Sequence, residues 1–124
     1  MLLRSHKMSN KILTLTGVIP PYRDGEYSVE KNIIRAPYDA KKEANIKQQR
    51  YVNGGYMVAS SKLISYLTSF NECRLESEIF LKLINEKQLA VFPHRGFWKW
   101  LDTDRDYLYL QNLVDKNQMY WLQE

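Results

Sequence analysis

The chain has 124 residues, of which 44% are hydrophobic and 13% aromatic, and a net charge of +4. This composition fits one folded domain and excludes a disordered chain. The single cysteine, Cys73, excludes an internal disulfide and indicates a reducing, cytoplasmic compartment. Arg4 and Lys7 interrupt the hydrophobic start of the chain. We therefore expect neither a signal peptide nor a membrane span.

The positive charge belongs to the first part of the sequence. Residues 1–50 hold ten Lys and Arg against five Asp and Glu, whereas residues 51–124 hold eight against nine. Basic residues near nine tyrosines suggest binding of single-stranded nucleic acid. The lysines are scattered, however, and most tyrosines alternate with aliphatic residues as buried side chains do. We therefore expect no nucleic-acid partner and no membrane partner.

The first third of the chain predicts strands. Residues 11–19 (KILTLTGVI) are β-branched and alternate in polarity, which predicts a strand. The segment PPYRDG, residues 20–25, predicts the turn that ends it. EYSVE (26–30) and IIRAPY (33–38) predict a hairpin that turns at Lys31-Asn32.

A charged connection and another strand follow. Residues 39–50 (DAKKEANIKQQR) are polar and weakly periodic, so we expect a surface loop. YVNGGYMVAS (51–60) predicts a strand that Asn53-Gly54-Gly55 interrupts. Adjacent glycines in a strand indicate a β-bulge or a place where another group approaches the backbone. The motif is thus either purely structural or a set of N–H groups and an amide offered to a sugar hydroxyl or a phosphate.

The second half mixes helices and strands. SSKLISYLTSF (60–70) has a serine N-cap and apolar residues at helical spacing, and LESEIFLKLINEK (75–87) repeats that spacing. QLAVFPH (88–94) and GFWKWL (96–101) predict strands, and TDRDYLYLQNLVDKN (103–117) predicts a final helix. Because strands and helices are mixed without repeats, an α/β or α+β fold is indicated.

No hydrolytic triad or zinc site is expected. His6 lies in a terminus that we expect to be frayed, and His94 follows Pro93 in a loop. Cys73 has no histidine near it in sequence. Two histidines and one cysteine so far apart are a poor set of zinc ligands. We interpret them as a small buried thiol and two surface imidazoles.

Three aspartates at the start of the final helix have different explanations. Thr103 and Asp106 have the spacing of a capping box, and Asp104 with Asp106 complements the positive end of the helix. Asp102 is not needed for this and follows the strand predicted over residues 96–101, at the end where α/β sheets bind ligands. A carboxylate there can bind Mg²⁺ together with phosphate oxygens. The residues alone leave Asp102 open between metal ligand and ordinary helix-start acid.

Three motifs, in this order, resemble the C-terminal half of the sugar-1-phosphate nucleotidyltransferases, and among these the glucose-1-phosphate cytidylyltransferases. They are Pro20-Pro21-x-Arg23-x-Gly25, Asn53-Gly54-Gly55, and GFWKWLDTDRD from Gly96 to Asp106. The last motif is specific, whereas the first two are weak alone and persuasive in this order and spacing. The similarity covers nearly the whole chain, from about His6 onward.

The resemblance implies a fold and a reaction. The fold would be one partial domain over residues 1–124, the C-terminal part of a Rossmann-like, glycosyltransferase-A-like mixed sheet with flanking helices. CTP and glucose 1-phosphate would give CDP-glucose and pyrophosphate, with Mg²⁺ bridging phosphates. Asp102 matches the second metal-binding aspartate of the family, and Gly25, Asn53 and Gly54 match positions that line the sugar pocket.

Two departures from the family pattern change the expectation. The N-terminal nucleotide-binding half, with its Gly-rich loop and first metal aspartate, is missing from the sequence. Where the family has Glu-Lys-Pro, this chain has Asp39-Ala40, and Lys41 or Lys42 substitutes only with a shifted backbone. We therefore expect a truncated or split enzyme with little activity alone, paired with an N-terminal half or forming a homo-oligomer through exposed strand edges. The alternative is a non-catalytic binding or assembly module that docks on another nucleotidyltransferase chain.

Overall fold

The computed structural model of the chain describes residues 1–19, 27–37, 50–67 and 74–122. These residues form two compact units, Met1–His94 and Arg95–Glu124, and each is described by itself. Within the described ranges, no helix combines the length and the apolar character that crossing a membrane requires.

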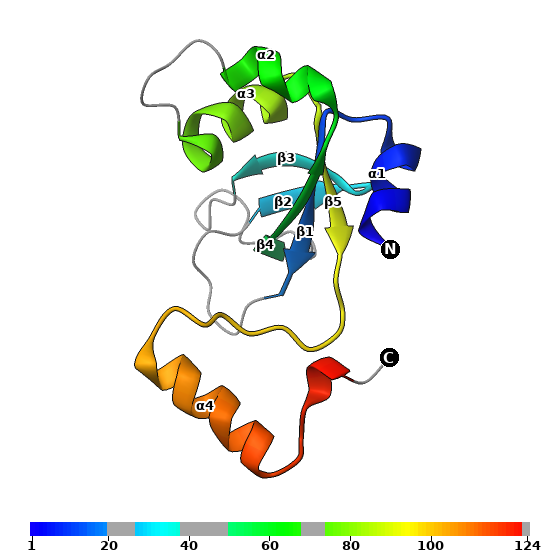
Figure 1. The fold of residues 1–124 in the computed structure, drawn as a ribbon. Coiled ribbons are helices and arrows are strands. Elements are labelled where there is room, and N and C mark those ends of the chain that lie inside the picture. The colour runs from blue at the N-terminus through cyan, green and yellow to red at the C-terminus, as the bar shows by residue number, and fades with distance from the viewer. Residues whose placement is uncertain (20–26, 38–49, 68–73, 123–124) are drawn as a thin grey trace, which may run out of the picture. The chain divides into compact units, whose positions relative to one another are not determined.

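The first unit contains strands β1 to β5 and helices α1 to α3 (Figure 1). In chain order its elements are α1 (Leu2–Ser9), β1 (Leu13–Val18), β2 (Tyr27–Glu30), β3 (Ile33–Pro37), β4 (Arg50–Ala59), a 3₁₀ turn (Ser61–Leu63), α2 (Ile64–Leu67), a π-helical turn (Leu75–Ile79), α3 (Phe80–Asn85) and β5 (Leu89–Pro93). The second unit contains α4 (Asp104–Asp115) and a 3₁₀ turn (Tyr120–Leu122). The structure is therefore of the mixed α/β kind that the sequence predicted.

The strands form a mixed sheet that closes on itself in the order β1-β4-β2-β3-β5. Strand β1 runs parallel to β5 and antiparallel to β4. The pair of Ile33 with Ala90 joins β3 to β5 and closes the ring. The hairpin β2–β3 folds across from β4 to β5, but β2 pairs only with Arg50 and Tyr51 of β4. The expectation of exposed strand edges is therefore wrong at this end of β4 and stays a prediction for its residues 53–59.

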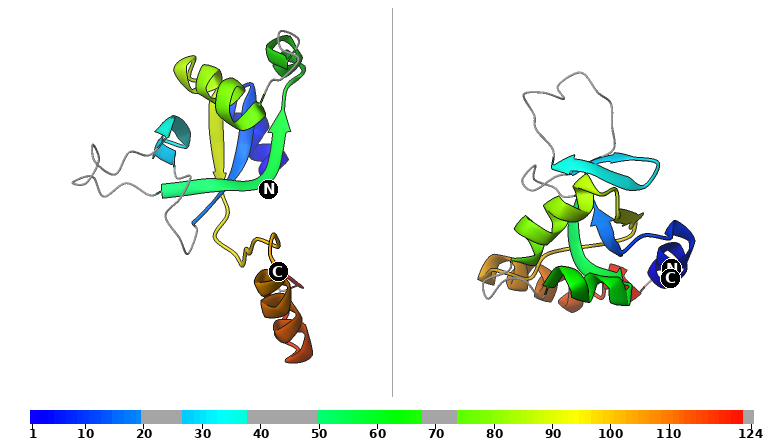
Figure 2. Two further views of the ribbon diagram at one scale, coloured as in Figure 1. Left: turned by 90° about the vertical axis from the view of Figure 1, so that its left-hand side faces the viewer. Right: turned by 90° about the horizontal axis from the view of Figure 1, so that it is seen from above.

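The core lies between the strands and α3 with the π-helical turn before it. All six residues of β1 are buried, and α1 and α3 lie on opposite sides of the strands (Figure 2). The largest fully buried apolar side chains come from β1, β3, α3 and β5: Leu13, Leu15, Val18, Ile34, Phe80, Leu83, Leu89 and Val91. The helical spacing predicted over residues 75–87 is confirmed, since Ile79, Phe80, Leu83 and Ile84 are all buried.

The strand predictions of the first unit are confirmed where the structure describes them. Strands β1, β4 and β5 fall on the predicted segments, and Pro93 ends β5. Lys31 and Asn32 form the hairpin turn with φ angles of 49° and 63°, because a tight two-residue turn takes positive φ at both positions. The turn predicted at residues 20–25 lies outside the described residues, as does the loop predicted over 39–50 apart from Arg50.

One expectation about the ends of elements is wrong, and another is confirmed in its position only. The N-terminus is not frayed, because residues Leu2–Ser9 form α1 and His6 is buried. The His6 Nδ1 atom lies 2.8 Å from the Thr14 hydroxyl of β1, a buried partner that only the packing of α1 on the sheet supplies. Ser60 does occupy an N-cap position, but its side chain makes no capping bond.

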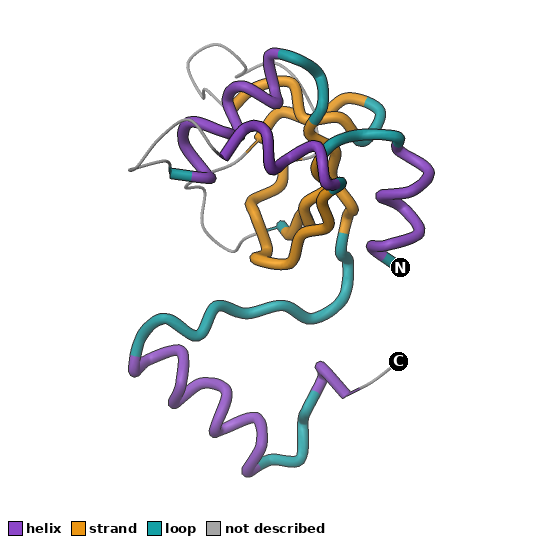
Figure 3. The backbone as a smooth tube through the Cα atoms, turned by 45° about the horizontal axis from the view of Figure 1, so that its top comes forward, coloured by secondary structure: helices purple, strands orange, loops and turns teal. Residues whose placement is uncertain are grey.

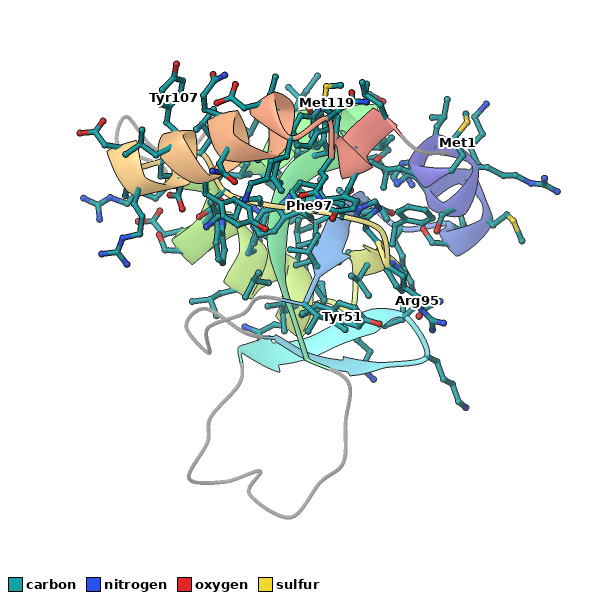
Figure 4. All side chains as sticks on the ribbon, turned by 90° about the horizontal axis from the view of Figure 1, so that it is seen from below. Met1, Tyr51, Arg95, Phe97, Tyr107 and Met119 are labelled. Atoms are coloured by element: carbon teal, nitrogen blue, oxygen red, sulfur yellow. The ribbon has the colours of Figure 1, made fainter. Side chains whose placement is uncertain are left out.

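The prediction of a strand over residues 96–101 is also wrong. Figure 3 shows this segment as a loop that leads into α4. No strand pairs with it among the described residues. Its apolar side chains instead pack within the second unit: the Phe97 ring, labelled in Figure 4, lies 5.8 Å from the Tyr120 ring and 5.6 Å from the Trp121 ring.

Candidate functional site

Asn53, Gly54 and Gly55 form a bulge in β4. Leu15 of β1 pairs with Met57, but Gly17, two residues further, pairs with Asn53. Strand β4 therefore carries two more residues than β1 at this point, and the strand bends there (Figure 2). Gly55 has φ 93°, a conformation that glycine adopts without strain. The bulge that the glycine pair predicted is confirmed.

The Asn53 side chain is held by two hydrogen bonds. Its Oδ1 accepts from the Gly55 N–H at 2.9 Å, and its Nδ2 donates to Glu76 Oε1 at 2.9 Å. Asn53 is half-buried, whereas Gly55 and Glu76 are exposed. The bulge thus presents a fixed amide next to exposed backbone, an arrangement suited to a ligand that both donates and accepts hydrogen bonds.

A cavity of about 460 Å³ lies elsewhere on the first unit, between α1, the β2–β3 turn and β5. Its polar lining consists of Arg4, Ser5, Ser9, Lys31 and Asn32. Neither Asn53 nor Gly54 lines this cavity, so it is distinct from the Asn53 bulge.

The second unit contains the predicted capping box at the start of α4. Thr103 Oγ1 accepts from the Asp106 N–H at 3.2 Å, and Asp106 Oδ2 accepts from the Thr103 N–H at 3.2 Å. Lys99 also donates to Asp106 Oδ1 at 2.5 Å. These bonds account for Thr103 and Asp106 as structural residues, as the sequence predicted.

The same bonds change the acidity of Asp106. The hydrogen bond from Lys99, followed by that from Thr103, lowers the pKa of Asp106 from 3.8 to about 2. Charge-assisted bonds favour the ionised carboxylate, which is the physical cause of this direction. At neutral pH the Asp106 carboxylate is therefore ionised, and its oxygens already accept hydrogen bonds.

This shift predicts a pH response of α4. A depressed pKa contributes stability above the ordinary value of 3.8 and loses it as the pH falls toward about 2. We expect the Thr103 and Asp106 amide signals to move between about pH 4 and pH 2, as the first turn of α4 frays. Two-dimensional ¹⁵N NMR from about pH 5 to about pH 2 measures this. Asp106→Asn should lack that transition, and an unchanged transition in the variant would show that another group titrates.

Asp102 differs from Asp106 in the partners of its carboxylate. Its carboxylate has no hydrogen bond or ion pair within the described part of the chain, and the residue is exposed. Only its backbone N–H contacts Asp106 Oδ2, at 3.4 Å. The free carboxylate fits the one or two protein ligands that Mg²⁺ takes. No group of three His, Cys, Asp or Glu in the described ranges could hold a metal by itself.

The predicted site residues are distributed over both units. Asn53 and Gly54 are adjacent in the β4 bulge, whereas Asp102 belongs to the second unit. Gly25 and Cys73 lie outside the described residues. Glu76 was not predicted, because its partner Asn53 lies 23 residues away and no local pattern links the two.

The fold and the site define an α/β protein with a glycine-rich strand bulge and a separate free carboxylate. No family model matches the chain. It is 30% identical over 116 residues to glucose-1-phosphate cytidylyltransferase of Salmonella typhi, a match that covers 94% of this chain and 43% of the relative. It is 27% identical over 120 residues to the probable glucose-1-phosphate cytidylyltransferase of Bacillus subtilis, covering 97% and 45%.

A further relative is named for a different activity from that of the two cytidylyltransferases. Mannose-1-phosphate guanyltransferase 2 of Candida glabrata is 34% identical over 67 residues, or 50% of this chain and 18% of the relative. The resemblance to the sugar-1-phosphate nucleotidyltransferases that the three motifs predicted is therefore confirmed by these relatives. The chain spans less than half the length of the two cytidylyltransferases.

Proposed function

We propose that this chain forms the sugar-binding part of a glucose-1-phosphate cytidylyltransferase. In the proposed reaction, a phosphate oxygen of glucose 1-phosphate attacks the α-phosphate of CTP. The new phosphate–oxygen bond gives CDP-glucose, and pyrophosphate leaves. Catalysis of this kind depends on positioning and charge neutralisation more than on covalent chemistry by the protein.

The β4 bulge is the observation that carries this proposal. A sugar offers hydroxyl groups that donate and accept, and Asn53 presents an amide that does both. Gly55 has open space where a side chain would project, so a ring can approach the backbone. The mixed sheet with parallel β1 and β5 is compatible with the C-terminal part of a Rossmann-like, glycosyltransferase-A-like fold.

Asp102 is the proposed Mg²⁺ ligand. The ion would neutralise the phosphate charge of the substrates when bound. Lys99 and Asp106 are paired with each other, which leaves the exposed Asp102 carboxylate available. The proposed role of Asp102 is therefore to hold the metal from the protein side, with phosphate oxygens and water as the other ligands.

The 124 residues contain no Gly-rich triphosphate loop. We propose that the nucleotide is held by residues beyond this sequence, in an N-terminal half or in a second chain, and that turnover by this chain alone is slight.

Binding and turnover test the proposal separately. Titration of glucose 1-phosphate should shift the amide signals of Asn53, Gly54 and Gly55 in ¹⁵N NMR, and Asn53→Ala should weaken binding about tenfold. Inorganic phosphate is the control ligand and should leave these signals in place. Absence of any response to glucose 1-phosphate would overturn the proposed function. Rapid pyrophosphate release from CTP, glucose 1-phosphate and Mg²⁺ would contradict the need for further residues.

A further inference from the structure

One side-chain contact links the β4 bulge to an unusual helical turn. Asn53 Nδ2 donates to Glu76 Oε1 at 2.9 Å, across 23 residues of sequence. Glu76 lies in the π-helical turn Leu75–Ile79. Single π-helical turns are rare and occur frequently at functional sites.

The turn holds Glu76 in place although the residue is exposed. Ile79 is 3% exposed, and the partly buried Leu75 packs against the same core cluster. These two residues anchor the turn at both ends, so the backbone of Glu76 is fixed relative to β4. Glu78, in the same turn, is also exposed but has no side-chain partner in the described part of the chain.

The contact determines which way the Asn53 amide faces. A carboxylate only accepts hydrogen bonds, so Glu76 requires the amide nitrogen on its side. The Gly55 N–H only donates, so it requires the amide oxygen on the other side. One N–H and one oxygen lone pair of Asn53 are left over. These match a hydroxyl group, which donates and accepts at once.

We propose that Glu76 is a positioning residue for sugar binding: it fixes the Asn53 amide in the orientation that receives a sugar hydroxyl. The inference rests on the proposed function, because it assigns Asn53 to the sugar. It adds a residue that no motif of the sequence selected.

Three variants of the full chain test this assignment, with glucose 1-phosphate as the ligand and ¹⁵N NMR as the readout. Glu76→Ala should weaken binding about tenfold, because a bond to a charged group is lost. Glu76→Gln should bind within about threefold of the unmodified chain, because its amide oxygen still accepts from Asn53. Glu78→Ala, the matched control in the same turn, should bind normally.

Two further measurements distinguish a positioning role of Glu76 from a direct contact with the ligand and from a general effect on stability. The side-chain amide signals of Asn53 should shift in Glu76→Ala without ligand, and the melting temperature should match that of Glu78→Ala. Equal binding by Glu76→Ala and the unmodified chain would overturn the inference alone. Equal losses in Glu76→Gln and Glu76→Ala would overturn it in favour of a direct carboxylate contact. No binding by the unmodified chain would overturn the proposed function and this inference with it.

Discussion

Gly17→Ala is expected to destabilise the first unit by about 3 kcal/mol, the upper end of the range for overpacked cores. Gly17 lies in β1, between β4 and β5. A Cβ atom there would collide with Cγ2 of Val91 and lie 3.0 Å from both Cβ and Cγ of Tyr51. Tyr51 is 2% exposed and Val91 1%. Because both side chains are buried, moving either one would disturb the packing around it.

The melting temperature measures this effect. A loss of about 3 kcal/mol corresponds to a decrease of roughly 12 °C or more for a unit of this size. Gly55→Ala is the matched control, since its φ of 93° strains an alanine but nothing lies within 4 Å of the added atom. We expect it to cost only roughly 1–2 kcal/mol.

A double variant identifies the colliding group. Val91→Ala alone should destabilise the unit by opening a cavity. In the Gly17→Ala background the same substitution removes the methyl group that the new Cβ meets, so the combined loss should be smaller than the sum of the single losses. Additive losses, or a Gly17→Ala chain that melts like the unmodified one, would show that the close packing around Gly17 is relaxed in solution.

Asp102→Asn is expected to remove the proposed metal site. Replacing the carboxylate by an amide leaves the shape and removes the negative charge, so divalent-cation affinity should fall at least about tenfold. Mn²⁺ serves as the probe in the presence of glucose 1-phosphate. Its paramagnetism should broaden the amide signals of residues 101–103 in the unmodified chain and leave them sharp in the variant.

Asp104→Asn is the matched control for this experiment. Asp104 is the first residue of α4, two positions from Asp102, and it is likewise exposed. The variant should retain the broadening. Broadening that disappears in both variants would indicate general attraction of cations to an acidic helix end, and broadening that persists in Asp102→Asn would remove Asp102 from the site.

Local patterns predicted those elements whose stabilising contacts lie nearby in sequence. The capping box needs only Thr103 and Asp106, three residues apart, and that spacing alone predicts it. Strand β1 and the helical residues 79–84 were likewise predicted, because burial of one face leaves a period of two or 3.6 residues in the sequence. The bulge at Asn53 followed from two adjacent glycines.

Distant contacts were not predictable in this way. The segment 96–101 has the alternation of a strand, but a strand needs a partner, and in the described structure Phe97 packs on the C-terminal turn instead. His6 has an ordinary polar side chain, and only the packing of α1 on β1 brings the Thr14 hydroxyl to it.

Local sequence patterns were enough to predict the mixed α/β class, the helix cap, the glycine bulge and the motifs that resemble a nucleotidyltransferase, since each depends on residues close together along the chain. The folded arrangement was needed to show that the described strands close into a ring and that Glu76 contacts Asn53. It also showed that the Asp102 carboxylate is free of described partners while Asp106 is paired with Lys99. These outcomes depend on which distant side chains the packing brings within hydrogen-bonding distance, and spacing along the chain does not encode that.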